Sequence, residues 1–235
     1  MDLAPLARYL SGLTSLFFPV ICKGCGKILK SSRTVICGRC EMELPRTNFL
    51  KKKDNPVAQM FWGRVKLEYA ASLFYYRKAE LLQKLIHHLK YHGGKETGIY
   101  LGRLAGKMLK QTEMAGQFDA IVPIPLHYRK QRIRGYNQSE LLAYGINEIT
   151  SIPVINKAVV RPEYNESQTR RGRYERWQNV KDIFRVIDQV PLINKHILVL
   201  DDVVTTGSTI ESFCQSLRDV PGIKLSALTI GYADR

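Results

Sequence analysis

The chain has few acidic residues for its length, and it lacks repeats and low-complexity tracts. Of its 235 residues, 21 are acidic and 36 are basic, which gives a formal net charge of +15. Such an excess of positive charge favours anionic partners such as phosphates, nucleic acid or acidic surfaces, but says little about fold. The alternative is a basic protein without such a partner. The absence of repeats excludes solenoid and fibrous architectures.

The amino-terminal segment lacks the features of a secretory signal. Residues 1–21 are apolar, but Asp2 and Arg8 flank the apolar run wrongly for a signal peptide, and no small-residue cleavage site follows. Pro19 ends the run well short of the roughly 20 residues that a membrane helix requires. We therefore expect an amphipathic helix over residues 1–21, no membrane span, and a cytoplasmic protein.

Four of the five cysteines form one cluster. Two Cys-x2-Cys pairs, Cys22 with Cys25 and Cys37 with Cys40, are separated by eleven residues. A glycine inside each pair permits a turn that points two thiolates at one ion, and two such turns complete a tetrahedral shell of four sulfurs. A disulfide is the alternative, which a reducing compartment disfavours. Because four protein sulfurs leave no position for water, we predict a structural zinc finger over residues 22–45.

After the finger, the chain alternates between strand and helix patterns. Residues 46–68 are polar and bracketed by prolines, so we expect a linker there. The apolar periodicity from 69 to 235 predicts strands at 69–76, 118–124, 153–160, 196–200 and 223–232, and helices at 79–92, 98–114, 139–150 and 208–219. Strands that alternate with helices form a parallel sheet with helices on both faces. The predicted fold class is α/β, with a small zinc-ribbon module ahead of it.

Ligands of such sheets bind beyond the carboxyl ends of the strands, so the loops there are candidate sites. After strand 196–200, Asp201 and Asp202 precede a run of hydroxyl residues around one glycine. The glycine permits a tight turn, and the amide end of the helix that follows favours a phosphate. The aspartates can accept hydrogen bonds from vicinal hydroxyls. We therefore predict a ribose 5-phosphate site, with the phosphate bound by Thr205, Thr206, Gly207, Ser208 and Thr209. The alternative is a capped helix with surface aspartates, whereas a P-loop is excluded because no lysine follows the glycine.

The other two candidate loops are rich in arginine. The loop over residues 125–138 gathers four cations that repel one another unless an anion, such as a second phosphate group, binds them. A solvated basic loop is the alternative. Residues 161–185 interleave arginines with aromatic side chains and are long for a connection, which is typical of lids and binding loops. The alternative for this segment is a platform for single-stranded nucleic acid.

Two kinds of motif resemble known families. The stretch "ILVLDDVVTTGST" is similar to the thirteen-residue phosphoribosyl pyrophosphate (PRPP) motif of type I phosphoribosyltransferases. The order of "LFFPVICKGCG", "CGRC", "LIHHLKYHGG", "IVPIPLHYRKQRIRGYNQSELLA" and "SQTRRGRYERWQNVKDIF" resembles the ComF family. This resemblance runs from about residue 16 to the end of the chain. It implies a type I phosphoribosyltransferase-like domain over residues 69–235, and a role in natural transformation alongside DNA-uptake proteins.

The ComF resemblance also implies a role for each loop. Asp201 and Asp202 would be the catalytic pair that holds the ribose hydroxyls, and Mg²⁺ would bridge the ribose and pyrophosphate oxygens. The implied pyrophosphate loop comprises His127, Arg129, Arg132, Arg134 and Gly135. The implied flexible hood over the site comprises Gln168, Arg170, Arg171 and Arg176. In this superfamily pyrophosphate leaves C1 through an oxocarbenium-like transition state, and a nitrogen nucleophile takes its place.

One position departs from the family chemistry. Some purine phosphoribosyltransferases carry an aspartate where Thr205 stands, and it accepts a proton from the incoming base. His127 is the nearest titratable substitute, although a surface or hydrogen-bonding role is the default. Lys90 belongs to a family motif, and we expect it to approach the phosphates. The competing hypothesis is a non-catalytic accessory protein that binds single-stranded DNA and whose PRPP pocket is a sensor or vestigial.

Overall fold

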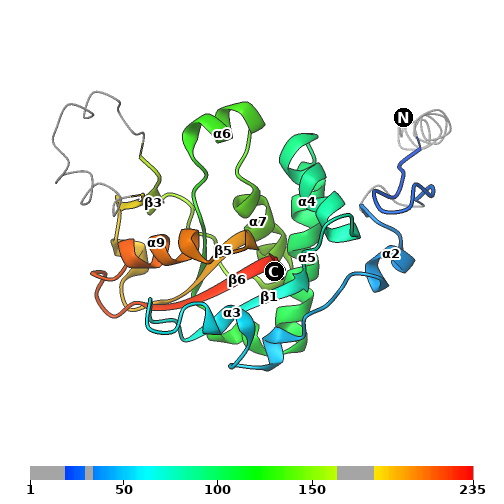
Figure 1. The fold of residues 1–235 in the computed structure, drawn as a ribbon. Helices are drawn as coiled ribbons and strands as arrows, with labels where there is room; N and C mark the ends of the chain where they lie inside the picture. The colour runs from blue at the N-terminus through cyan, green and yellow to red at the C-terminus, as the bar shows by residue number, and fades with distance from the viewer. Residues whose placement is uncertain (1–18, 30–33, 163–182, 235) are drawn as a thin grey trace, which may run out of the picture. The chain divides into compact units, whose positions relative to one another are not determined.

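The computed structural model describes residues 19–29, 34–162 and 183–234, which belong to two compact units divided between Leu44 and Pro45 (Figure 1). Nearly all of the helix expected over residues 1–21 lies outside the described residues. No helix in the described ranges is long and apolar enough to cross a membrane.

The smaller unit consists of two turns and one short helix. An antiparallel bridge joins Ile21 to Ile28, and the Cys22 N–H donates to the Lys27 carbonyl over 2.8 Å. Gly26 closes this turn at a φ of 76°, a left-handed conformation that favours glycine. The second turn leads into helix α2 (Gly38–Met42). The backbone thus forms the two turns that the cysteine spacing predicts.

The larger unit is built on a parallel sheet with strand order β1-β6-β5-β2. The strands are β1 (Tyr69–Tyr75), β2 (Ala120–Pro123), β5 (His196–Val204) and β6 (Lys224–Tyr232). Their residues are almost all buried, as expected for a parallel sheet covered on both faces. The predicted α/β class is confirmed.

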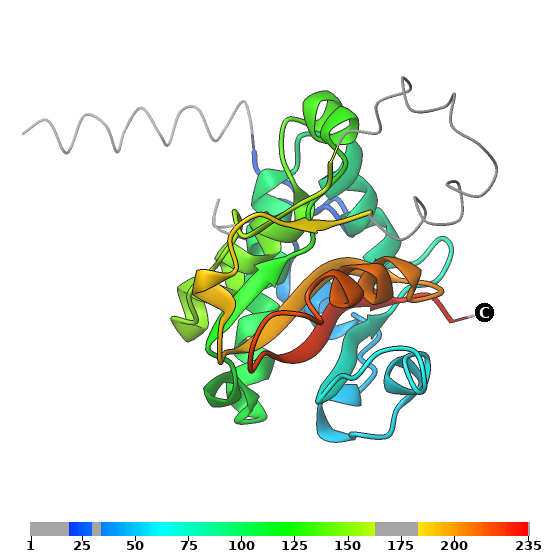
Figure 2. The same ribbon diagram turned by 90° about the vertical axis from the view of Figure 1, so that its left-hand side faces the viewer.

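Helices cover the two faces of this sheet. The helices are α4 (Leu81–Tyr91), α5 (Lys95–Gln111), α6 (Tyr128–Arg134), α7 (Gln138–Thr150) and α9 (Ser208–Ser216). Helices α5 and α7 pack against each other on one face, whereas α9 lies on the other (Figures 1 and 2). Short 3-10 turns lie at Met114–Gln117 and Val190–Leu192.

Glycine lets helices α5 and α7 approach closely. A Cβ atom on Gly102 would lie 2.2 Å from the Leu142 carbonyl oxygen, and one on Gly145 would lie 2.2 Å from the Ile99 carbonyl oxygen. Both distances are far inside van der Waals contact, so any larger residue would force the two helices apart. This close packing fixes α7, whose amino terminus reaches the candidate site.

Residues 46–68, where we expected a linker, are folded onto strand β1. The segment contains the 3-10 turn Phe49–Lys51 and helix α3 (Pro56–Gln59). The Asn55 side chain caps α3 and also donates to the Ala70 carbonyl of β1 over 2.8 Å. Phe61 is only 1% exposed. The polar character comes from exposed lysines, while five apolar side chains of the segment are buried, so this stretch is part of the larger unit; they are Phe49, Leu50, Val57, Ala58 and Phe61.

Several elements differ from the expected boundaries, among them α5, which was expected over 98–114 and covers Lys95–Gln111. The strand expected over 153–160 is divided: residues near Val154 pair with β2, and β3 (Val159–Val160) pairs with β4 (Arg185–Val186) in a separate antiparallel sheet. The Ile155 N–H donates a hydrogen bond to β2, and the Ile187 N–H donates one to the Ala158 carbonyl. Backbone hydrogen bonds therefore hold both halves of the 153–160 stretch. Strand β5 continues to Val204, and the loop expected at 125–138 contains helix α6.

Candidate functional site

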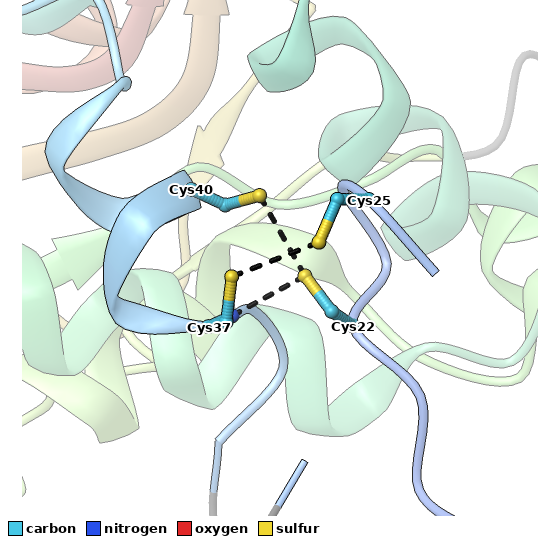
Figure 3. Close-up of side chains that lie close together, drawn as sticks. All are labelled: Cys22, Cys25, Cys37 and Cys40. Carbon is cyan, nitrogen blue, oxygen red and sulfur yellow. Dashed lines mark hydrogen bonds between the residues drawn. The ribbon is translucent and has the colours of Figure 1, made fainter. Parts of the chain in front are cut away.

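The four predicted ligand cysteines converge in the smaller unit (Figure 3). Their sulfurs lie within 4.8 Å of one another, with 3.7 Å between Cys22 and Cys40 and 3.7 Å between Cys25 and Cys37. Tetrahedral coordination with Zn–S bonds of about 2.3 Å requires sulfurs about 3.8 Å apart. The cluster therefore suits a metal ion such as zinc, with two of its sulfur pairs already at the required spacing.

The backbone around the cluster prepares Cys22 for metal binding. Burial opposes ionisation of this thiol, but hydrogen bonds from neighbouring backbone N–H groups outweigh it and lower the pKa of Cys22 to about 6. One of these donors is the Cys37 N–H, 3.2 Å from the Cys22 sulfur. Burial and the adjacent thiols raise the pKa of Cys40. Without an ion, Cys22 thus ionises more readily than Cys40, and a divalent metal would neutralise the thiolates that form on binding.

The acidic pair lies near the carboxyl end of β5, on residues that still belong to the strand. The two carboxylates are held by different neighbours. One oxygen of Asp201 accepts hydrogen bonds from the Ser139 hydroxyl over 3.1 Å and from the Asp202 N–H over 2.9 Å. Asp202 is 7% exposed, and its Oδ2 lies 2.7 Å from the Lys90 ammonium. That contact is an ion pair without the alignment of a hydrogen bond, because Oδ2 has no hydrogen-bond partner among the described residues.

Burial and neighbouring charge raise the pKa of one member of the acidic pair, Asp201. Burial and the charge of Asp202 raise the pKa of Asp201 to about 7, against the opposing effects of the Asp202 N–H, Ser139 and Lys90. Asp201 is therefore about half ionised near pH 7 in the free protein. A ligand that donates hydrogen bonds to the carboxylate would favour its ionised form. Such a carboxylate is typical of a functional site.

Two helices bring the partners of the acidic pair into place. Lys90 lies in the last turn of α4, and Ser139 lies in the first turn of α7. The Asn137 side chain caps α7 by accepting from the Ser139 N–H over 3.1 Å, and it donates to the Ile124 carbonyl beyond β2 over 3.0 Å. The end of β2 and the start of α7 are thereby tied together. Sequence analysis did not single out Ser139, although the Asn-x-Ser start of a helix is a recognisable capping pattern.

Further polar groups near this end of the sheet are buried without a partner among the described residues. These atoms are Oε1 of Gln138 and Nη1 of Arg134. The guanidinium of Arg134 also lies 5.7 Å from the centre of the Tyr91 ring. Burial lowers the pKa of Arg161, and the charge of Asp201 opposes this effect, which places Arg161 within electrostatic reach of the acidic pair. Buried polar atoms of this kind are common where a ligand or water completes the site.

The hydroxyl-rich loop joins β5 to α9 as predicted. Gly207 has a φ of 77° and immediately precedes the first residue of α9. The four hydroxyl residues Thr205, Thr206, Ser208 and Thr209 are exposed, while the Gly207 backbone is buried. The Thr206 and Ser208 hydroxyls lie 3.1 Å apart. The loop thus presents hydroxyls at the amino end of a nine-residue helix.

The folded segment before β1 packs against this loop. The sequence did not predict this contact. A Cβ atom on Gly207 would lie 2.9 Å from the Phe61 ring, so the ring packs directly against the glycine. Arg64 donates to the Thr206 carbonyl over 3.2 Å and forms an ion pair with Glu211 on α9. Phe61 and Arg64 therefore fix the conformation of the hydroxyl-rich loop.

The arginine-rich loop after β2 is helical. His127 precedes α6, and its Nδ1 accepts from the Arg129 N–H over 3.3 Å. Gly135 ends α6 at a φ of 80°. Arg129 and Arg132 are exposed, whereas Arg134 is partly buried. The predicted hood residues Gln168, Arg170, Arg171 and Arg176 lie outside the described residues.

Comparisons with known proteins point to one group of relatives. No family model matches the chain. It is 30% identical over 207 residues to Competence protein F of Haemophilus influenzae, a match that covers 84% of both chains. It is also 30% identical over 207 residues to the DNA utilization protein YhgH of Escherichia coli K12, covering 84% of this chain and 83% of that one.

Solved structures give a more partial likeness. Glutamine PRPP amidotransferase from B. subtilis matches 62% of this chain with a TM-score of 0.44 at 18% identity. A structure described as the allosteric regulatory enzyme of purine biosynthesis matches 55% of this chain with a TM-score of 0.40 at 21% identity. The present chain covers only 30% and 25% of these two enzymes, respectively.

Proposed function

The chain belongs to the ComF family, and on that premise we propose that it binds PRPP and transfers its phosphoribosyl group to a nitrogen acceptor. One observation carries the proposal. An acidic pair, of which Asp202 is buried and Asp201 partly exposed, lies near the carboxyl end of strand β5, and an exposed hydroxyl-rich loop joins the end of this strand to α9. This arrangement matches the two ends of a ribose 5-phosphate, with vicinal hydroxyls at one end and a phosphate at the other.

In this proposal the acidic pair binds the ribose. The carboxylates of Asp201 and Asp202 accept hydrogen bonds from the two ring hydroxyls, and Ser139 keeps Asp201 in position. Because the pKa of Asp201 is about 7, ribose binding is expected to release a fraction of a proton at neutral pH. A change in bound protons when the ribose binds would therefore distinguish this site from a surface without a titrating carboxylate.

The hydroxyl-rich loop binds the 5-phosphate. Exposed backbone N–H groups at the start of α9 and the hydroxyls of Thr205 to Thr209 supply donors, while the left-handed Gly207 allows the backbone to turn around the phosphate. Phe61 and Arg64 hold the loop in this shape before the ligand arrives, so little ordering is required on binding.

Basic residues stabilise the departing pyrophosphate. Lys90 and Arg161 lie near the acidic pair, and Arg129, Arg132 and Arg134 lie on or beside α6 beyond the end of β2. Positive charge placed where negative charge develops lowers the barrier for loss of the leaving group. Mg²⁺ bound with PRPP would add charge neutralisation between the ribose and pyrophosphate oxygens. The acidic pair and the hydroxyl-rich loop are the oxygen donors in this chain that suit such a complex.

No residue of this chain is assigned as the base for the acceptor. Thr205 does not titrate near neutral pH. His127 uses its Nδ1 to cap α6, which favours the hydrogen-bonding role over proton transfer. The proposal therefore favours an acceptor that is already nucleophilic, such as an amine, over a nucleobase that needs deprotonation.

The test is to follow the phosphorus resonances of PRPP by 31P NMR with the zinc-loaded protein, Mg²⁺ and a set of nitrogen nucleophiles that includes ammonia. We expect release of pyrophosphate that depends on both Mg²⁺ and the acceptor, and that is lost in Asp202→Asn. Release that persists unchanged in Asp202→Asn would contradict the role of the acidic pair. Binding without turnover by any acceptor would instead favour the second candidate.

The second candidate is a single-stranded DNA-binding protein whose PRPP pocket is a sensor or vestigial. Two observations favour it: the net charge of +15 and the relatives called DNA utilization proteins. Such a protein would show a steep fall of DNA affinity with salt, because each phosphate contact releases counterions. Either candidate connects the chain with DNA uptake, as the name of its competence relative does.

A further inference from the structure

A second basic surface lies on the larger unit, apart from the acidic pair. An open pocket of about 980 Å³ lies beside the carboxyl-terminal half of α9, and a smaller pocket of about 270 Å³ adjoins it. Both are lined by Val65 and Glu68, so they form one continuous depression. Glu68 directly precedes β1, and Lys224 begins β6, so the depression extends to the amino ends of these strands. The acidic pair lies near the carboxyl end of β5 and lines neither pocket.

Positive charge dominates this depression. The larger pocket is lined by five basic and two acidic residues, and the smaller one by Lys53 with the acidic Asp54 and Glu68. Among the described residues, ion pairs engage Arg64 with Glu211 and Arg218 with Asp219. In the same part of the chain, no ion pair engages the other three, which are the exposed Lys66, Arg185 and Lys224. Lys53, at the edge of the smaller pocket, is also exposed. These cations face solvent and are available to an anion.

An exposed tryptophan lies in the smaller pocket with Lys53, beside the larger pocket that the other three cations line. Trp62 lines the smaller pocket, and 62% of its surface is exposed, which is unusual for so large an apolar side chain. Its backbone is held firmly, because Phe61 on one side is buried against Gly207, and Arg64 on the other side binds the Thr206 carbonyl. The Trp62 N–H itself donates to the Gln59 carbonyl over 3.3 Å. The indole ring is therefore presented to solvent on a fixed support.

We propose that this surface, formed by Lys53, Trp62, Lys66, Arg185 and Lys224 and called here the Trp62 surface, binds single-stranded DNA. Unpaired bases stack on an exposed aromatic ring, and lysine and arginine side chains bind the backbone phosphates on either side. A duplex keeps its bases stacked on each other and cannot use Trp62 in this way. An acidic protein segment would use the cations but would not need the indole ring.

The position of the Trp62 surface has a functional consequence. The proposed PRPP site lies beyond the carboxyl ends of the strands, whereas the depression extends to the amino ends of β1 and β6. The two ligands therefore use different residues of the larger unit. This inference rests on the second candidate function, single-stranded DNA binding, for which it names a surface, and it does not require the chain to be an enzyme.

The test is fluorescence anisotropy of labelled oligothymidine of 30 nucleotides, titrated with the full zinc-loaded chain over a range of salt concentrations. Trp62→Ala should weaken binding by roughly 5- to 150-fold, the effect of losing one stacked base. Lys66→Gln combined with Lys224→Gln should reduce the magnitude of the salt slope by about 1.4, because two phosphate contacts are lost. All three positions are exposed, so the variants should fold normally.

Matched controls separate this surface from general charge and from the proposed PRPP site. Lys107→Gln combined with Lys110→Gln removes the same charge from exposed positions of α5 and should leave the salt slope unchanged. Asp201→Ala should leave DNA affinity within a factor of two, whether or not PRPP binds to the wild type.

Four results would overturn the inference. One is an equal affinity of the wild type and Trp62→Ala for the oligonucleotide, and another is an equal affinity of the wild type for duplex and single-stranded DNA. The third is a loss of binding only in Arg170→Gln with Arg171→Gln, which would assign the DNA to the segment over 161–185. Displacement of the oligonucleotide by polyglutamate as readily as by unlabelled oligothymidine would also contradict it, because it would point to an acidic protein partner.

Discussion

Replacing Lys90 by methionine should destabilise the protein in a pH-dependent way. Lys90 lies 2.7 Å from Asp202, and the two side chains are 26% and 10% exposed, so the pair is neither fully buried nor at the surface. Loss of one partner costs about 3–5 kcal/mol in a buried pair, whereas an exposed pair contributes about 0–1 kcal/mol. We therefore expect Lys90→Met to lower the free energy of unfolding by about 2 kcal/mol at pH 8.

The pH dependence follows from Asp201. Its pKa in the folded chain, about 7, is above its ordinary value of 3.8, so the stabilisation from its neutral form is lost as pH rises towards 7. A shift of this size corresponds to at most about 4 kcal/mol. Lys90 limits the shift, and without it the pKa of Asp201 rises further. At pH 6 Asp201 carries its proton in both proteins, so the difference between them should be smaller than at pH 8.

The assay is urea denaturation of the zinc-loaded protein at pH 6.0 and 8.0, followed by tryptophan fluorescence and circular dichroism. Lys84→Met is the matched control, because Lys84 lies on the same helix with its side chain exposed. It should change stability by less than about 0.5 kcal/mol at either pH. A loss of stability in Lys90→Met that is equal at both pH values, or equal to that of Lys84→Met, would refute the electrostatic argument.

Three further predictions concern packing, the hydroxyl-rich loop and the metal. Gly145→Leu should lower the melting temperature sharply in differential scanning calorimetry, because a Cβ atom there already meets the Ile99 carbonyl at 2.2 Å; an unchanged melting temperature would show that α5 and α7 separate freely. Gly207→Val should weaken PRPP binding at least tenfold in a filter-binding assay, because the residue has a φ of 77° and packs on Phe61; unchanged binding would contradict the role of this loop. Metal analysis should find one zinc per chain. Removal of the zinc by a chelator should release four titratable thiols in addition to Cys214, and it should unfold the smaller unit without unfolding the sheet. A zinc content of zero after expression in zinc-supplemented medium would contradict the assignment.

Local patterns in the sequence were sufficient for the features that depend on neighbouring residues. The Cys-x2-Cys spacing determines both metal-binding turns, and the structure brings the four sulfurs together as predicted. Strand and helix patterns gave the α/β class, and the order of aspartates, hydroxyls and glycine located the loop at the end of β5. Each of these features is encoded within about twenty consecutive residues, where periodicity and turn chemistry are informative.

Features that depend on distant segments were missed for a physical reason. Residues 46–68 appear polar because the exposed run Lys51–Lys53 and the prolines interrupt the apolar pattern, but Phe61 is buried against a loop about 145 residues further along the chain. Similarly, the ion pair of Lys90 with Asp202 and the hydrogen bond from Ser139 to Asp201 join three separate elements. Nothing in the sequence near Lys90 indicates which carboxylate it meets. The division of the 153–160 strand depends on β4, whose pairing is equally non-local.

The central claim is that the acidic pair and the hydroxyl-rich loop at the end of β5 form a PRPP site. The most direct test is calorimetric titration of the zinc-loaded protein with PRPP, with and without Mg²⁺, beside an Asp201→Ala variant whose folding is verified by circular dichroism. The account predicts micromolar binding that requires Mg²⁺ and disappears in Asp201→Ala. Absence of binding in the wild type, or equal binding in the folded variant, would contradict it.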